Sequence, residues 1–146
     1  MSAPTPGDVV ATLRPGTVTR TTLALFAGAS GDHNPIHIDL DSARASGMDD
    51  VFAHGMLSMA YLGRLLTERF PQTHIRELST RFTAITPVLS EPVLTATVKE
   101  LIDVADEQRV VLDLDVRLAD GTRTLSGTAV VAWSVPDRDA NATLAP

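Results

Sequence analysis

Pro71 divides the sequence into two parts that differ in their hydrophobic periodicity. Residues 55–70 are apolar on almost every face of a helix, and Pro71 ends that helix. After Pro71, apolar and polar residues alternate, as they do in strands that bury one face. The sequence therefore predicts a largely buried helix followed by an antiparallel sheet that wraps around it, in a single α+β domain.

Four long strands are predicted after Pro71. The clearest covers residues 110–118, in which buried-type side chains occupy every second position. The others cover 75–85, 93–102 and 122–135. Asp120 and Gly121 form a typical hairpin turn signal between the last two strands.

The N-terminal half is expected to contain shorter elements. The β-branched run at 15–22 predicts a short strand, and apolar spacing from Leu23 predicts a helix that ends before Gly31. One further helical turn is expected at 41–45, closed by Gly47. The single domain is expected to span 1–146, with flexible ends at 1–8 and 137–146.

Composition narrows the classes of function. The net charge of −6 argues against a general binder of nucleic acid or of anionic membranes. No apolar run reaches the roughly 18 residues that a membrane-spanning helix needs, and the first residues lack a secretory signal pattern. The chain has no cysteine, so disulfides and thiolate chemistry are excluded, and a cytoplasmic location is expected.

Asp32 and His37 form the most informative pair of polar residues. Gly31 and Pro35 interrupt any helix here, so both side chains are expected on a tight turn. Gly55 begins the long helix, where free backbone N–H groups favour negative charge. An acid/base pair beside such a helix start suits chemistry on a carbonyl compound.

Three segments resemble one known family. These are FAGASGDHNPIHIDLDSA at 26–43, FAHGML at 52–57 and RFTAITPVLSEPV at 81–93. Together they are similar to the MaoC-like, or (R)-specific enoyl-CoA hydratase, family of hot-dog proteins. The order of the expected elements matches that family over nearly the whole chain.

The resemblance implies a hot-dog fold, a dimer with paired sheets and a substrate carried as a thioester on coenzyme A or acyl carrier protein. It implies reversible hydration of a trans-2-enoyl thioester to the (R)-3-hydroxyacyl thioester, with no cofactor. By that resemblance, Asp32 and His37 hold the water, and the N–H of Gly55 binds the thioester carbonyl. No metal is expected, because the spacing of Asp32 and His37 matches no zinc motif.

Six further residues are candidates for substrate binding. Some family members carry a serine that supports the aspartate where this chain has Gly63, so Ser30 or Asn34 is expected to orient Asp32 instead. The remaining candidates are Met56, Leu57 and Tyr61 for an acyl channel and Arg81 for a phosphate contact. Each has a simpler interpretation as a turn, core or solvated strand residue. His54, beside the helix dipole, is expected to be a neutral structural hydrogen bonder.

Two other functions remain open from the sequence. A hot-dog thioesterase would usually carry a carboxylate on the central helix, and residues 56–67 contain no acid. A non-catalytic acyl-binding or partner subunit would be expected to lose Asp32 or His37, and both are present. A homodimer is expected, with a heterodimer of related hot-dog subunits as the alternative.

Overall fold

The protein is described by a computed structural model that covers residues 4–134. Five antiparallel strands form one sheet in the order β1-β3-β4-β5-β2. Their bounds are β1 (Val9–Leu13), β2 (Ile75–Phe82), β3 (Val93–Val104), β4 (Glu107–Arg117) and β5 (Arg123–Ser134). The helices are α1 (Arg20–Ser30), α2 (Leu40–Ala45) and α3 (Gly55–Arg69), with short 3-10 turns η1 (Pro35–His37) and η2 (Gln72–His74).

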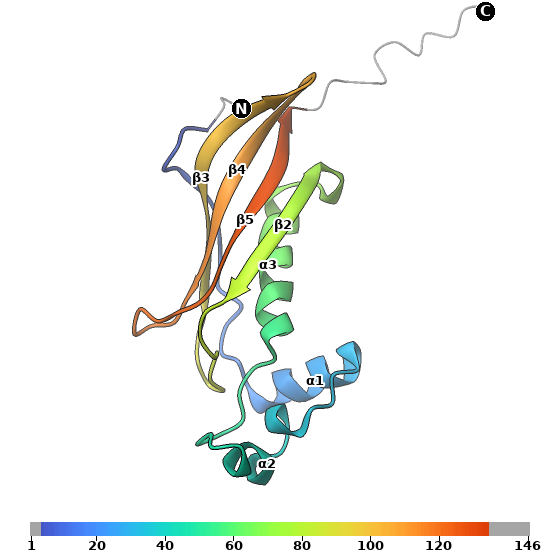
Figure 1. Cartoon of the computed structure of the whole chain (residues 1–146), viewed down its shortest axis with the longest axis vertical. Helices are drawn as coiled ribbons and strands as arrows, with labels where there is room; N and C mark the ends of the chain where they lie inside the picture. Colours follow the sequence, from blue (N-terminus) through green and yellow to red (C-terminus); the bar gives the residue numbers. More distant parts are fainter. Residues whose placement is uncertain (1–3, 135–146) are drawn as a thin grey trace, which may run out of the picture.

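The long helix α3 runs along one face of the sheet, whereas α1 and α2 gather beyond one end of it (Figure 1). Helix and sheet enclose the main core, because strand alternation points every second side chain toward α3. The core includes Leu62, Leu65, Leu66, Leu94, Leu112, Val116 and Leu125. A long helix against a curved antiparallel sheet confirms the predicted α+β class, with the sheet wrapped around a central helix.

Helix α3 is buried on one side only, so the expectation of burial on almost every face is wrong for the single chain. Leu62 and Leu66 have no exposed surface, whereas Met56 is 53% exposed. The apolar residues of α3 do lie on almost every face of the helix, but the sheet covers only the side that faces β1, β2 and β3. An apolar strip of α3 near its N-terminus is left open.

The strand expected at 15–22 is also wrong. Helix α1 already begins at Arg20, where the Thr19 side chain caps it by accepting a hydrogen bond from the Thr22 backbone N–H at 3.0 Å. The β-branched run therefore includes the start of a helix, because the hydrogen bond made by the threonine cap outweighs the weak strand propensity of these residues. The first strand is instead β1, which pairs with β3 and makes the sheet five-stranded.

The N-terminal segment is partly fixed rather than loose. The Gly7 backbone N–H donates to the Val98 oxygen at 2.8 Å, and Asp8 accepts from the Thr5 backbone N–H. Residues 1–3 and 137–146 lie outside the described residues. Elsewhere the predicted boundaries shift by up to three residues: β2 ends at Phe82 rather than 85, and β4 begins at Glu107 rather than 110.

Candidate active site

Asp32 lies immediately after α1, on a turn that a left-handed glycine opens. Gly31 has φ of 74°, and its N–H donates to the Ala27 oxygen at 3.0 Å. Only glycine adopts this conformation without strain, so it ends α1 and redirects the chain. The Asp32 carboxylate is exposed and accepts a hydrogen bond from the Asn34 backbone N–H at 3.2 Å.

Ser30 and Asn34, the residues expected to orient Asp32, each share one hydrogen bond with it, and each bond is donated by a main-chain N–H. The Asp32 N–H donates to Ser30 Oγ at 3.2 Å. The Asn34 side chain does not reach the carboxylate, because its Oδ1 accepts from the Ile36 N–H at 3.3 Å and caps η1. The turn therefore fixes Asp32 mainly through main-chain donors.

His37 ends η1 and is 8% exposed. Its Nδ1 lies 2.8 Å from the Phe52 backbone oxygen, and a carbonyl oxygen can only accept. Nδ1 therefore carries the proton, and the opposite ring nitrogen, Nε2, is left to act on a ligand. The Phe52 ring packs edge-on to the imidazole, with centroids 4.8 Å apart, and restricts its rotation.

His54 lies behind His37 and connects it to Asp32. The His54 ring is 1% exposed, and its Nε2 lies 3.1 Å from the Asp32 backbone oxygen. The centroids of the two imidazole rings are 4.0 Å apart. Burial lowers the pKa of His54, and the hydrogen bond to Asp32 opposes that shift only in part. The sequence predicted a neutral histidine from the helix dipole; the direction of the shift is the same, but its main cause is burial.

Gly55 is the first residue of α3, so its N–H is one of the donors that the helix itself leaves unpaired. A Cβ on Gly55 would lie 3.0 Å from the Phe82 ring, which comes from the end of β2. Phe82 is 50% exposed and stands beside the helix start. The missing side chain at Gly55 lets this ring approach the backbone.

A largely apolar hollow of about 530 Å³ opens next to Asp32. Helix α1 contributes Phe26 and Ser30, and α3 contributes Met56, Met59 and Ala60, with Leu78 of β2 on the remaining side. Ser30 and Met56, two of the residues predicted to bind substrate, thus line the same hollow as Asp32. Its shape and lining suit an aliphatic chain attached to a polar head near Asp32.

The structure does not bring the other predicted substrate-binding residues to this hollow. Leu57 is 5% exposed in a core cluster with Val18 and Leu23, because it lies on the covered side of α3. Tyr61 is half-buried and packs against both core clusters, and burial raises its pKa. Arg81 lines a polar depression with Ser79 and Asp113. Since Asp113 alternates with buried Leu112 and Leu114, that depression lies on the sheet face opposite α3.

Sequence reasoning missed Phe26, Leu78 and Phe82 as neighbours of the site, and it named Met59 only among core residues of which some could line an acyl channel. Phe26 and Met59 were assigned to helices, and nothing in their spacing shows that α1 and α3 meet at an open hollow. Phe82 lies in the strand predicted at 75–85, and nothing in that pattern shows which residue it meets across the fold. The signal that could have found it is its position in the third segment of family resemblance.

Asp32, His37 and His54 are also the group in the described residues best placed to hold a metal ion. Each offers one ligand atom, and the three atoms lie within 4.8 Å of one another. Two imidazoles and a carboxylate are acceptable ligands for zinc. The Nε2 of His54 is hydrogen-bonded to the Asp32 backbone oxygen, so only its Nδ1 is left to bind an ion. The expectation of a metal-free site stays a prediction.

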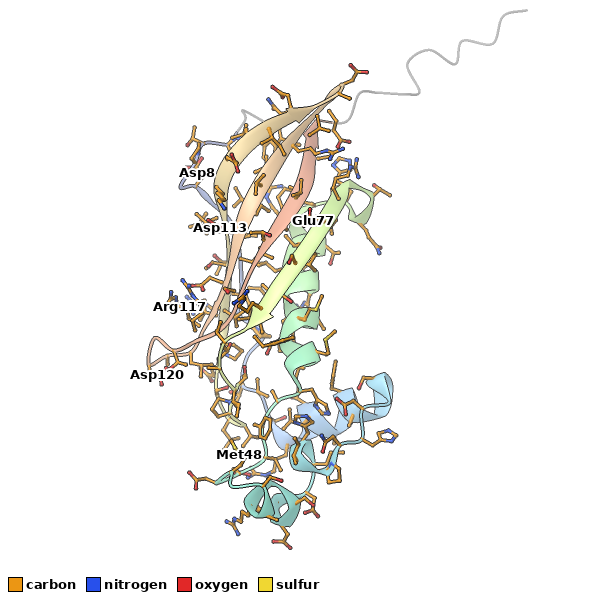
Figure 2. The ribbon with its side chains drawn as sticks, in the orientation of Figure 1. Asp8, Met48, Glu77, Asp113, Arg117 and Asp120 are labelled. Atoms are coloured by element: carbon orange, nitrogen blue, oxygen red, sulfur yellow. The ribbon has the colours of Figure 1, made fainter. Side chains whose placement is uncertain are left out.

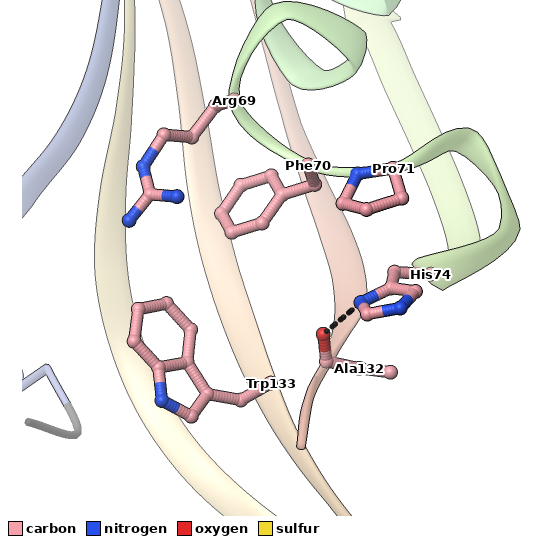
Figure 3. Close-up of a pocket in the computed structure, with 6 residues that line it drawn as sticks. All are labelled: Arg69, Phe70, Pro71, His74, Ala132 and Trp133. Atoms are coloured by element: carbon pink, nitrogen blue, oxygen red, sulfur yellow. Dashed lines mark hydrogen bonds between the residues drawn. The ribbon is translucent and has the colours of Figure 1, made fainter. Parts of the chain in front are cut away.

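A second hollow, of about 300 Å³, lies at the opposite end of α3 (Figure 3). The Arg69 guanidinium lies 4.9 Å from the Phe70 ring centroid and 5.6 Å from that of Trp133. His74 Nδ1 donates to the Ala132 oxygen at 3.2 Å. These contacts close the end of the core.

Within residues 4–134, no helix is long and apolar enough to cross a membrane.

Comparison with known proteins identifies the family. The family model described as "MaoC like domain" matches residues 2–119. The long helix against a curved antiparallel sheet is the hot-dog fold predicted from the sequence, and it is confirmed by the R-hydratase structure on which this chain superposes. The chain belongs to the MaoC-like family.

The relatives are similar over the motif region. The chain is 38% identical over 55 residues to an (R)-specific enoyl-CoA hydratase of Rhodospirillum rubrum, covering 38% of each protein. It is 43% identical over 49 residues to 3-hydroxyacyl-thioester dehydratase Z of Mycobacterium tuberculosis, covering 34% of this chain and 32% of the relative. The matched segments therefore span only about a third of the relatives' lengths.

Solved structures share the fold over most of the chain. The unliganded R-hydratase PhaJ1 of Pseudomonas aeruginosa superposes with a TM-score of 0.78 at 26% identity, covering 88% of this chain and 82% of that one. A chain of the ChsH1-ChsH2 complex of Mycobacterium tuberculosis gives a TM-score of 0.76 at 18% identity, covering 89% and 98%. The second likeness shows the fold alone.

Proposed function

We propose that the protein is a hydro-lyase that adds water to a trans-2-enoyl thioester, giving the (R)-3-hydroxyacyl thioester, or catalyses the reverse dehydration. The observation that carries this proposal is the convergence of Asp32 and His37 beside the free N–H groups at the start of α3. The names of the relatives, (R)-specific enoyl-CoA hydratase and 3-hydroxyacyl-thioester dehydratase, support the same reaction.

In the proposed reaction, one water lies between the Asp32 carboxylate and His37 Nε2. Asp32 accepts a hydrogen bond from this water, and His37 removes a proton as the water oxygen attacks C3 of the double bond. The proton then goes to C2, so the elements of water are added across one carbon–carbon bond. Because His37 Nδ1–H is held by the Phe52 oxygen, Nε2 faces the water with its lone pair.

Attack at C3 moves negative charge onto the thioester oxygen. The Gly55 N–H is the proposed donor to that oxygen, and the positive end of the α3 dipole adds to the effect. A preorganised backbone donor of this kind is typically worth about 3 kcal/mol of transition-state stabilisation. The acyl chain occupies the hollow between α1 and α3, with Met56, Met59 and Leu78 around it.

The test is hydration of short-chain and medium-chain trans-2-enoyl-CoA, measured as loss of the enoyl-thioester absorbance. Asp32→Asn and His37→Ala should each abolish turnover while the circular dichroism spectrum is unchanged. Asp41→Asn, on an exposed carboxylate of α2, is the matched control and should retain full activity. Release of free thiol without hydration would instead establish a thioesterase.

We further propose that two copies pair through the outer edge of β2. Within the described residues, β2 is hydrogen-bonded to a neighbouring strand on one side only, that of β5. A strand added antiparallel at this edge, centred on Ser79, would bring Glu77 of one copy opposite Arg81 of the other. Among residues 4–134, neither side chain takes part in an ion pair (Glu77 is labelled in Figure 2).

This pairing is self-complementary and therefore favours a homodimer over a heterodimer. Leu78 lies on the same edge strand and lines the apolar hollow, so a second copy of β2 would add a wall to the acyl site. The fold does occur in a complex of two different proteins, ChsH1-ChsH2, which keeps the heterodimer as the outcome to exclude. Coenzyme A or acyl carrier protein as the thioester carrier, the absence of a cofactor and a cytoplasmic location stay predictions.

A further inference from the structure

Among the described residues, His54 is the one buried titratable group beside the candidate site to which the proposed reaction gives no task. It is 1% exposed, lies next to the Phe26 ring at 5.1 Å between centroids, and contacts the His37 ring. A histidine so deeply buried usually has a polar partner on each nitrogen. Here Nδ1 is buried without a hydrogen-bond partner in the part of the chain that the structure describes.

The partner of Nε2 determines the protonation of the ring. The Asp32 backbone oxygen can only accept, so the proton lies on Nε2. Burial lowers the pKa of His54, which leaves the ring neutral and Nδ1 bare. The unpaired nitrogen is a destabilising feature that an apolar ring would avoid. Its presence points to a task for the Nε2–H.

That task follows from the other hydrogen bonds of Asp32. The Asp32 N–H binds Ser30 Oγ and its carboxylate binds the Asn34 N–H, so both contacts stay within the turn itself. The bond from His54 is the contact that ties Asp32 to a segment far along the chain. His54 also precedes Gly55 and stacks on His37.

We propose that His54 is a positioning residue that holds Asp32 and His37 in fixed relation to the Gly55 N–H. The inference rests on the proposed hydratase function and deepens it. The His54 Nε2–H holds the Asp32 turn in place by donating to the Asp32 backbone oxygen, and the face of the His54 ring packs against the His37 ring. Residues 52–55 thereby position Asp32, His37 and the Gly55 N–H together, because the Phe52 backbone oxygen also accepts a hydrogen bond from His37 Nδ1.

Two substitutions separate this role from ordinary packing. His54→Phe keeps a flat ring against His37, removes the unpaired Nδ1 and loses the donor to Asp32. His54→Gln keeps an N–H donor at a similar reach but replaces the ring. A residue that served only packing would tolerate Phe better than Gln in both stability and activity.

The experiment measures kcat, KM and the melting temperature of wild type and both variants with the same enoyl-CoA. We expect His54→Phe to melt at the same or a higher temperature but to lose about 10- to 100-fold in kcat, with KM within about twofold. His54→Gln should keep more kcat than His54→Phe although it melts lower. Wild-type kcat in His54→Phe, or a loss that follows the melting temperature, would overturn the proposal.

A measurement on the wild type keeps the test independent of whether the variants fold. Long-range ¹H–¹⁵N spectra of the imidazoles should show His54 as the neutral Nε2–H form at about pH 7. A charged ring or the Nδ1–H form would contradict the tether to Asp32. Absence of hydration by wild type would count against the proposed function alone, whereas the spectra test the His54 assignment directly.

Discussion

The Phe82 ring lies so close to Gly55 that a Cβ on the glycine would be 3.0 Å from it. The contact joins the end of β2 to the start of α3, at the backbone N–H proposed to bind the thioester oxygen. Phe82 is half-exposed, so its ring can move aside without opening the core. The position of this ring therefore bears on access to the site more than on stability.

Gly55→Ala should remain folded but lose about tenfold or more in kcat/KM, because the added methyl group pushes the Phe82 ring from its place beside the thioester site. The free energy of unfolding should change by less than about 0.5 kcal/mol, since the ring has room outside. The double variant Gly55→Ala/Phe82→Leu should recover part of the activity, with Phe82→Leu alone as the control. Full activity in Gly55→Ala would show that this contact does not limit access.

Gly31→Ala should reduce both stability and activity. With φ of 74°, an alanine at this position is strained by about 1 kcal/mol, and relief of that strain would shift the adjacent Asp32. Urea unfolding and hydration kinetics measure the two effects. The matched control is Gly63→Ala inside α3, where a Cβ meets nothing within 4 Å. There alanine should stabilise by about 0.5–1 kcal/mol without changing turnover.

Stability should decrease in mild acid because of His54. Its folded-state pKa lies below the ordinary 6.5, so the unfolded chain binds the proton more readily. The contribution of neutral His54 to the free energy of unfolding is complete above pH 6.5 and is lost as the pH falls from 6.5 toward the folded-state pKa. Chemical unfolding at several pH values from 7.5 to 5 should show this decline, and it should be smaller in His54→Gln.

Acidic residues change the stability of the fold only at lower pH, so their effect can be separated from that of His54. The Arg76 and Arg109 guanidinium groups lower the pKa of Glu107 from 4.5 to about 2. Its contribution is present above pH 4.5 and is lost as the pH falls toward 2. A decline between pH 6.5 and 5 that persisted unchanged in His54→Gln would assign it to another group.

The overall fold could be predicted from the sequence, because the change in hydrophobic periodicity at Pro71 indicates a long helix followed by antiparallel strands. Asp32 and His37 lie on a turn that Gly31 and Pro35 impose, so the local sequence indicates that the two side chains lie close together, whereas Gly55 begins a helix in a separate motif. Their roles in catalysis stay predictions. The strand at 15–22 failed because the Thr19 cap outweighs β-propensity. That Leu57 and Arg81 do not line the hollow could not be predicted, because the side of a helix or strand that meets the hollow depends on how α1, α3 and β2 pack together.

Removal of metal ions should leave the proposed hydration unchanged. The atoms of Asp32, His37 and His54 lie within 4.8 Å of one another, but the proposed mechanism uses the first two to hold water. Dialysis against a strong chelator followed by assay in metal-free buffer should give wild-type turnover. Added Zn²⁺ should inhibit by displacing that water, and Mg²⁺, which prefers oxygen ligands, should not. Loss of activity on chelation that Zn²⁺ restores would make the site a metal centre.

Charge reversal tests the proposed pairing of β2 strands most directly. In Glu77→Arg the proposed homodimer would place two arginines opposite each other at both ends of the pair, and in Arg81→Glu two glutamates. Like charges directly opposite are destabilising, so each variant should shift toward monomer in light scattering after size exclusion.

Mixing the two variants should then restore the dimer. The Glu77→Arg chain carries arginine at both positions and the Arg81→Glu chain carries glutamate at both, so opposite charges would face each other at each end of the pair. Attraction between exposed charges weakens with salt, so this recovery should be stronger at low ionic strength. Reversal of Glu100, an exposed residue of β3, is the control and should leave assembly unchanged. If both single variants stay dimeric, the copies do not meet in this register. If wild type is monomeric, the edge of β2 is left for a different partner.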